Sequence, residues 1–166
     1  LAFAATQALQ SWFYRNYPSH PKEQEYGFLA SSSLKPTRVL VENDTLAKIP
    51  AKAVIEGDIR LTPWYSPQEV RDGALAFINT LDIATLPVFG PSRYHLRDSS
   101  GTVKLEAVGA PTGGIACDRA SPGHVALVEA IATVRGEARP FSLTGTLPYV
   151  RFLQSHGFDV QITGFG

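Results

Sequence analysis

Asp58 and Arg60 carry side chains whose types and spacing suit the binding of a carboxylate. They stand two positions apart in "AVIEGDIRLT", residues 53–62, so in an extended strand both side chains leave the same face. A guanidinium held on a rigid strand binds a carboxylate through two parallel hydrogen bonds. The alternative is a solvated ion pair that contributes little to stability. Both interpretations stay open on these residues alone.

A second candidate lies in "SLTGTLPYVRF", where Gly145 and Thr146 precede a segment with a helical pattern. A glycine at a strand-to-helix turn lets a ligand approach backbone N–H groups, and the positive end of the helix dipole favours an anion there. Alternatively, Thr146 is an ordinary helix cap. The sequence therefore contains two candidate carboxylate-binding positions, Arg60 and the Gly145-Thr146 turn. It shows no evident residue that would break a bond.

The histidines and the single cysteine form no recognisable catalytic or metal-binding pattern. No histidine has a second ligand at H-x-D or H-E-x-x-H spacing, and His156 at a predicted helix end is interpreted as capping the last carbonyls. Cys117 has no neighbouring base, which favours a small core residue over a nucleophile. We therefore expect no metal ligand and no catalytic residue in this chain. The histidines are His20, His95, His124 and His156.

Charge and composition exclude several classes of partner. Fifteen basic and fifteen acidic residues cancel, so no basic field attracts nucleic acid or an anionic membrane surface. A hydrophobic share of 44% is sufficient for a core, and no apolar run approaches the roughly 20 residues that cross a bilayer. A lone cysteine excludes an internal disulfide framework and favours a reducing compartment. We expect neither a nucleic-acid nor a membrane partner.

The first part of the chain predicts the order helix, strand, strand, helix, strand. Apolar residues at helical spacing mark the first helix, which Pro18 and Pro21 should end. Ser66, Pro67 and Glu69 form a capping-box start for the second helix. The predicted ranges are a helix over 1–13, strands over 37–41 and 53–62, a helix over 67–81 and a strand over 102–108. This order predicts a small antiparallel sheet with two helices on one face.

The second part predicts a helix, a strand, a helix and a strand. Ser121 and Pro122 begin the first of these helices and Gly136 ends it, while Gly157 ends the second. Strands are predicted over 138–143 and 158–162. This alternation is typical of the closing units of a doubly wound α/β sheet. The proline- and glycine-rich stretch before it indicates a crossing between two domains, 1–110 and 111–166.

Three longer blocks carry a resemblance to a known family. They are "IPAKAVIEGDIRLTPWYSPQEV" at 49–70, "FYRNYPSHPKEQEYGF" at 13–28 and "FSLTGTLPYVRFLQSHGFDVQITGFG" at 141–166. The chain resembles the co-catalytic zinc hydrolases that include acetylornithine deacetylases, desuccinylases, aminoacylases and carboxypeptidases. The last two blocks are most similar to the plant-type acetylornithine deacetylases.

The resemblance implies a domain for each part and a role for the three candidate residues. Residues 1–110 are expected to form a dimerisation, or lid, domain without its first strand, and 111–166 the C-terminal portion of the catalytic domain. Arg60 is expected to bind the substrate carboxylate, with Gly145 and Thr146 lining the pocket. The family's metal ligands and catalytic glutamate find no match, so the resemblance implies a fragment that is inactive alone. Zinc, or cobalt, is expected only in the intact parent protein.

The function implied for that parent is hydrolysis of N2-acetylornithine to ornithine and acetate, in arginine biosynthesis. The expected partners are a second copy bound through the lid domain, or a chain that supplies the rest of the catalytic domain, together with a small acylated amino acid. The expected location is intracellular, in the cytoplasm or a plastid. The alternative is a non-catalytic dimerisation module derived from such a hydrolase.

Overall fold

The computed structural model describes residues 1–42, 45, 47, 49–87, 101–139 and 147–163. The chain divides into two compact units. Unit 1 comprises Leu1–Tyr17, Ser33–Ile59 and Gln68–Gly109, and unit 2 comprises Pro18–Ser32, Arg60–Pro67 and Ala110–Gly166. The predicted assignment of 1–110 to a lid and 111–166 to a catalytic domain is not tested by this division and stays a prediction.

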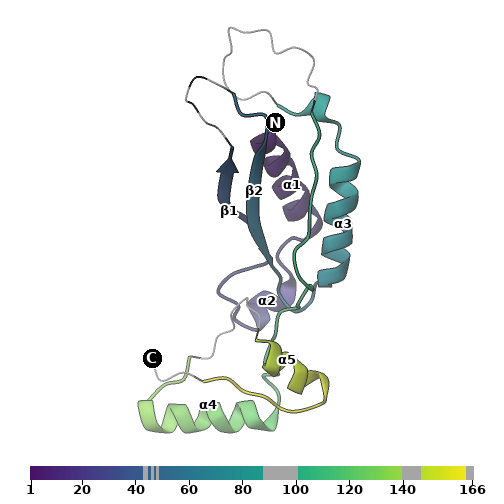
Figure 1. Cartoon of the computed structure of the whole chain (residues 1–166). Coiled ribbons are helices and arrows are strands. Elements are labelled where there is room, and N and C mark those ends of the chain that lie inside the picture. The colour runs from purple at the N-terminus through teal and green to yellow at the C-terminus, as the bar shows by residue number, and fades with distance from the viewer. Residues whose placement is uncertain (43–44, 46, 48, 88–100, 140–146, 164–166) are drawn as a thin grey trace. The chain divides into compact units, whose positions relative to one another are not determined.

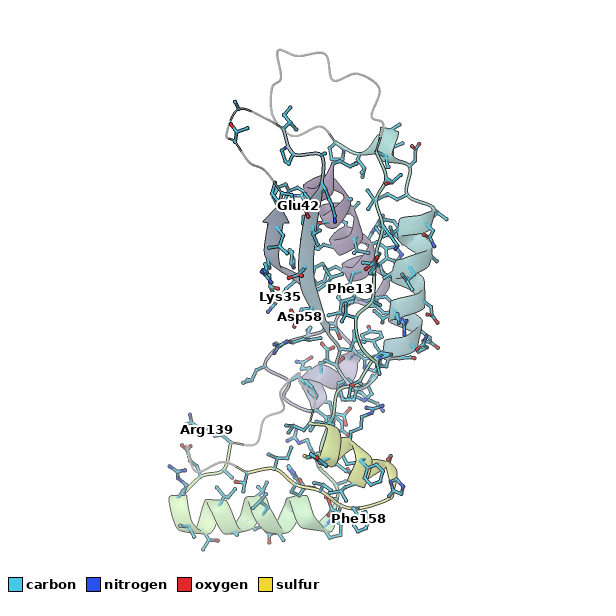
Figure 2. All side chains as sticks on the ribbon, viewed as in Figure 1. Phe13, Lys35, Glu42, Asp58, Arg139 and Phe158 are labelled. Atoms are coloured by element: carbon cyan, nitrogen blue, oxygen red, sulfur yellow. The ribbon has the colours of Figure 1, made fainter. Side chains whose placement is uncertain are left out.

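Two helices build the core of unit 1. Helix α1 spans Ala2–Asn16 and helix α3 spans Pro67–Asn79, so α3 begins at the proline that the sequence predicted. The ring of Trp12 stacks on that of Phe77, with centroids 5.5 Å apart. Phe13, labelled in Figure 2, is fully buried. The aromatic face of α1 therefore holds α3 in place. A 3₁₀ turn, η1 (Ile83–Thr85), follows α3.

The sheet of unit 1 contains two antiparallel strands, β1 (Ser33–Val41) and β2 (Ala53–Arg60). Figure 1 shows them side by side with α1 behind, and Gln10 of α1 donates a hydrogen bond of 3.1 Å to the carbonyl of Leu34. Lys35 and Asp58 lie near one another where β1 begins and β2 ends (Figure 2). Both predicted strands are thus present, but β1 is longer than predicted and β2 ends at Arg60, two residues before the predicted end.

The strand predicted over 102–108 is wrong, since no ladder of the described ranges includes these residues. Their side chains still alternate: Val103 and Leu105 are half-buried, while Lys104 and Glu106 are exposed. Lys104 and Glu106 form an ion pair of 2.7 Å, as expected for neighbours on one side of an extended chain. The period-2 pattern correctly predicted an extended segment, but it contains no information on a pairing partner.

Unit 2 contains a short helix, α2 (Pro21–Glu25), that the sequence patterns did not lead us to expect. Pro18 and Pro21 were interpreted only as helix breakers. Pro21 instead occupies the first turn of α2. A backbone N–H at that position would have no partner within the helix, so its absence in proline costs no hydrogen bond. His20 is the N-cap, and its Nδ1 accepts a hydrogen bond of 3.2 Å from the N–H of Lys22. The signal for this helix was therefore present in the sequence.

The other helices of unit 2 follow the predicted boundaries. Helix α4 spans Pro122–Arg135 and ends at Gly136, which has φ +82°. Helix α5 spans Pro148–Ser155 and is followed by Gly157, also at φ +82°. Both glycines take the left-handed conformation that ends helices. The N-cap position of α5 is Leu147, one residue after the Thr146 predicted.

The strand predicted over 158–162 is wrong, because none of these residues belongs to a ladder within the described part of the chain. The segment instead returns to the beginning of α4 (Figure 1), where Gln161 donates to the Ser121 hydroxyl at 3.0 Å. Most of the predicted strand 138–143 lies outside the described residues. The α+β class is confirmed, and the doubly wound sheet stays a prediction. No helix in the described ranges is long and apolar enough to span a membrane.

Candidate functional site

Arg60 is the last residue of β2 and its side chain is exposed. Asp58, two positions earlier, is half-buried on the same strand. Gly145 and Thr146 lie outside the described residues, so their predicted meeting with Arg60 in a common cleft stays a prediction. The structure does describe the residues that directly follow Arg60, 61–65.

Directly after Arg60, Thr62 enters a buried polar cluster that it forms with Glu23 and Ser32. The Thr62 hydroxyl donates a hydrogen bond of 2.8 Å to Oε1 of Glu23, and the Thr62 N–H donates to the Ser32 hydroxyl at 3.0 Å. The two hydroxyls are 3.2 Å apart. Because the Thr62 proton points to Glu23, the Ser32 hydroxyl is the donor between them. The exposed fractions are 0% for Thr62, 4% for Ser32 and 5% for Glu23.

This cluster corrects the predicted orientation of Thr62. Continued to residue 62, the period-2 alternation that puts Asp58 and Arg60 on one polar face of the predicted strand 53–62 puts Thr62 on that face as well. In the structure Thr62 is fully buried, because strand β2 has ended at Arg60 and Glu23 and Ser32 satisfy the buried hydroxyl. A buried polar group is tolerated only when it is hydrogen-bonded in this way.

Glu23 has a second carboxylate oxygen for which the described residues offer no partner. Oε2 is buried and accepts no hydrogen bond from them, whereas Oε1 accepts from Thr62. The phenol of Tyr65 lies in the same unit and donates to the Pro18 carbonyl. Desolvation raises the pKa of Tyr65, and the negative charge of Glu23 raises it further. Glu23 is thus a buried carboxylate with spare accepting capacity.

Aromatic rings of the 13–28 block surround Trp64 in unit 2. The His20 imidazole stacks on Trp64 with centroids 5.3 Å apart and 17° between planes. Tyr26 and Phe28 approach Trp64 edge-on, at 5.3 and 5.2 Å. These contacts join the chain after Arg60 to the block "FYRNYPSHPKEQEYGF". Two blocks far apart in sequence therefore form one polar and aromatic cluster.

A surface pocket of about 390 Å³ opens beside this cluster. Glu23 lines it together with His20 and Phe28, and hydroxyl and amide groups complete the lining. The Ser19 and Ser31 hydroxyls hydrogen-bond to each other at 2.8 Å. The remaining lining residues are Pro21 and Gln24. We call this the Glu23 pocket; it combines a carboxylate, neutral polar groups and two aromatic faces.

Gly114 brings a third segment against residues 61–63. A Cβ built on Gly114 would collide with the Leu61 carbonyl and approach Pro63, so only glycine permits this close approach. Arg151 of α5 donates a hydrogen bond of 2.6 Å to the Gly114 carbonyl, and Gln154 donates to Ala116 at 3.0 Å. Helix α5 is therefore hydrogen-bonded to the segment around Gly114, and this segment packs against residues 61–63, which follow β2.

The beginning of α4 is closed by Asp159. Its Oδ2 accepts a hydrogen bond of 2.8 Å from the N–H of Gly123, and its Oδ1 accepts from Gln161 at 2.6 Å. The hydrogen bond from Gln161, with a smaller one from Ser121, lowers the pKa of Asp159. A carboxylate of the chain itself thus occupies the positive end of this helix.

The histidines and the cysteine of the described ranges are occupied in structural roles. His124 Nδ1 lies 3.1 Å from Gln161 Oε1, and His156 Nδ1 donates to the Phe152 carbonyl at 2.8 Å, which confirms its predicted capping role. Burial raises the pKa of the Cys117 thiol, which disfavours the nucleophilic thiolate. Among the described residues no group of three or more His, Cys, Asp or Glu side chains could hold a metal ion.

Sequence reasoning selected Arg60 but missed Glu23 and Ser32. Both lie in or near a block already noted for its resemblance, but neither stands at a spacing that indicates chemistry. Their contacts with Thr62 span 39 and 30 positions respectively. Two of the blocks that carry the resemblance to the co-catalytic zinc hydrolases are therefore in contact. Known proteins that share these blocks are the relevant ones to compare with this chain.

Comparison with curated proteins identifies relatives that are named acetylornithine deacetylase. Acetylornithine deacetylase of Arabidopsis thaliana is 38% identical over 100% of this chain and 39% of its own length. Acetylornithine deacetylase of Dictyostelium discoideum is 40% identical over 98% of this chain and 38% of its own length. The resemblance to acetylornithine deacetylases is thus confirmed. The chain spans about two fifths of the length of these relatives.

Two further comparisons give no match. No protein-family model matches the chain, and no solved structure is similar to it at a significant level. A functional proposal therefore rests on the curated relatives and on the geometry around Arg60 and Glu23.

Proposed function

We propose that the protein is an amide hydrolase that removes the acetyl group from N2-acetylornithine, releasing ornithine and acetate for arginine biosynthesis. One observation carries the proposal: identity of 38–40% over 98–100% of the chain to proteins named acetylornithine deacetylase. The alignments cover nearly the whole chain rather than a single motif.

Within that function, the described part of the chain contributes substrate binding rather than bond breaking. Arg60 is proposed to bind the substrate carboxylate. It stands at the end of a paired strand, and the next residues are fixed by the hydrogen bonds of Thr62. A guanidinium on such a rigid support is suited to a planar carboxylate. Gly145 and Thr146 are proposed as further contacts of the same substrate.

A metal ion is also part of the proposal, and zinc is the proposed ion, with cobalt as the alternative. The described residues do not fit such a site, since they provide no cluster of three His, Cys, Asp or Glu side chains, and a zinc site needs three or four such ligands. We therefore assign no residue of the described ranges to metal binding and derive no catalytic step through it.

We propose further that two copies associate through the strand edge of unit 1. Within the described residues, β1 pairs with β2 alone. Val39, Leu40 and Val41 near its end are 45%, 37% and 48% exposed. An exposed apolar edge of this kind supports pairing with another strand. If the protein dimerises but hydrolyses no acylated amino acid, the non-catalytic dimerisation module is the better description.

The test is hydrolysis by the purified protein as its gene encodes it, supplied with Zn²⁺ or Co²⁺. We expect ornithine release from N2-acetylornithine, detected with an amine-reactive reagent, and loss of that release after treatment with a chelator. Bound metal is measured separately by mass spectrometry. Absence of hydrolysis from a folded, metal-supplied protein contradicts the proposal.

A further inference from the structure

We propose that the Glu23 pocket binds the positively charged side chain of the substrate amino acid, so that Glu23 determines specificity for a basic acylated amino acid. The inference rests on the proposed function. It begins from a buried carboxylate with one satisfied oxygen and one that lacks a partner among the described residues. Such an unsatisfied acceptor is rare in folded proteins and indicates a missing donor.

The lining of the pocket suits an ammonium group on a short alkyl chain. Glu23 supplies the opposite charge, and the Ser19 and Ser31 hydroxyls, 2.8 Å apart, are neutral acceptors at the surface. Phe28 and His20 add two aromatic rings to the lining, and such rings suit methylene groups and a cation. The volume of about 390 Å³ is at the small end of the range for ligand pockets. It accommodates one side chain rather than a macromolecular surface.

Thr62 links Arg60 to Glu23 along the chain. It follows Arg60 by two positions, which is at most roughly 7 Å of backbone, and its hydroxyl is 2.8 Å from Oε1 of Glu23. An amino acid with a basic side chain carries an anionic group and a cationic group, and the proposal assigns the first to Arg60 and the second to Glu23. All three residues belong to unit 2.

A metal ion is a poorer occupant of the same pocket. Glu23 is the carboxylate among the lining residues, and His20 Nδ1 already accepts from the Lys22 N–H. No cluster of three His, Cys, Asp or Glu side chains includes these residues, within the part of the chain that the structure describes. Divalent cations need more charged or imidazole ligands than this, whereas a primary ammonium is satisfied by one carboxylate and two neutral acceptors.

The test compares two substrates that differ only in the charge of the side chain. N2-acetylornithine and N2-acetylnorvaline have the same carbon chain, and only the first ends in an ammonium group. For the unmodified protein we expect kcat/KM to favour the ornithine derivative by about tenfold to 100-fold, the range for a charged hydrogen bond. In Glu23→Gln that preference should disappear, because kcat/KM for the ornithine derivative should fall by a larger factor than kcat/KM for the norvaline derivative.

Two more variants separate the pocket from the stability of the fold. Glu25→Gln, an exposed residue of the same helix α2, is the matched control and should retain the preference. Gln24→Lys places a cation at the pocket lining without touching the Thr62 cluster, because Gln24 is exposed. It should also abolish the preference. Equal losses on both substrates in Glu23→Gln, or an unchanged preference in Glu23→Gln and Gln24→Lys, overturn the inference.

Calorimetry with free ornithine tests the pocket independently of hydrolysis. If no acylated amino acid is hydrolysed, the proposed function fails, and ornithine binding alone then decides on the pocket. Binding that is lost in Glu23→Gln and kept in Glu25→Gln supports the pocket. Absence of binding, or stoichiometric capture of Zn²⁺ that is lost in Glu23→Gln, overturns it.

Discussion

The Thr62 hydroxyl donates a hydrogen bond of 2.8 Å to Oε1 of Glu23, across 39 positions of sequence. This contact links the segment after the substrate-binding candidate Arg60 to the helix that lines the Glu23 pocket. Both side chains are at least nine-tenths buried, so the hydrogen bond is shielded from competing water. The same hydrogen bond therefore fixes the chain next to Arg60 and orients Glu23.

Thr62→Val tests this contact, because valine has nearly the shape of threonine and lacks the hydroxyl. The variant leaves Oε1 of Glu23 unpaired and should lower the free energy of unfolding by about 1–3 kcal/mol. The measurement is urea denaturation followed by circular dichroism. Thr80→Val is the control: the Thr80 hydroxyl is exposed and bonds to carbonyls of α3, so a change within about 0.5 kcal/mol is expected. Equal effects at both positions would argue against a special role for Thr62.

Arg60→Lys tests the proposed carboxylate contact. Lysine keeps the charge but loses the planar pair of donors, so kcat/KM for N2-acetylornithine should fall by about tenfold to 100-fold. Arg38→Lys is the control, since Arg38 of β1 forms an exposed ion pair of 3.3 Å with Glu56, and exposed pairs contribute little. A fall in the control as large as in Arg60→Lys would contradict the assignment.

Gly114→Ala and Gly113→Ala form a matched pair. A methyl group on Gly114 meets the Leu61 backbone carbonyl, whereas one on Gly113 meets the end of the Arg151 side chain. Backbone cannot move aside as a flexible side chain can, so Gly114→Ala should destabilise the fold by about 1–3 kcal/mol. Gly113→Ala should cost less, losing at most the hydrogen bond from Arg151 to Gly114. Thermal unfolding of both variants shows which one is less stable. A lower unfolding temperature for Gly113→Ala than for Gly114→Ala would refute the close packing of Gly114 on Leu61.

The sequence predicted the elements whose boundaries depend on local chemistry. The start of α4 at Ser121-Pro122 and its end at Gly136 were predicted because capping and left-handed glycine act within a few residues. The strand over 102–108 was wrong, since alternation indicates an extended chain but not its hydrogen-bond partner. Glu23 was missed for a related reason: its contact with Thr62 is set by tertiary packing, which no local spacing reveals.

Asp159→Asn tests the link between residues 158–162 and α4 through its dependence on pH. Hydrogen bonds hold the pKa of Asp159 in the folded state below its ordinary value of 3.8, so the ionised carboxylate stabilises the fold above that pH. The contribution is lost as the pH falls through the lower, folded-state pKa. Asp159→Asn should therefore unfold at a lower urea concentration than the unmodified protein at neutral pH. The two midpoints should converge well below pH 3.8.

The exposed Asp72, which accepts from Gln68, provides the control variant Asp72→Asn. A difference at Asp159 that persists unchanged in acid would mean that the asparagine perturbs packing rather than charge. The hydrogen bond from Gly123 to Asp159 would then not be what fastens this segment to α4.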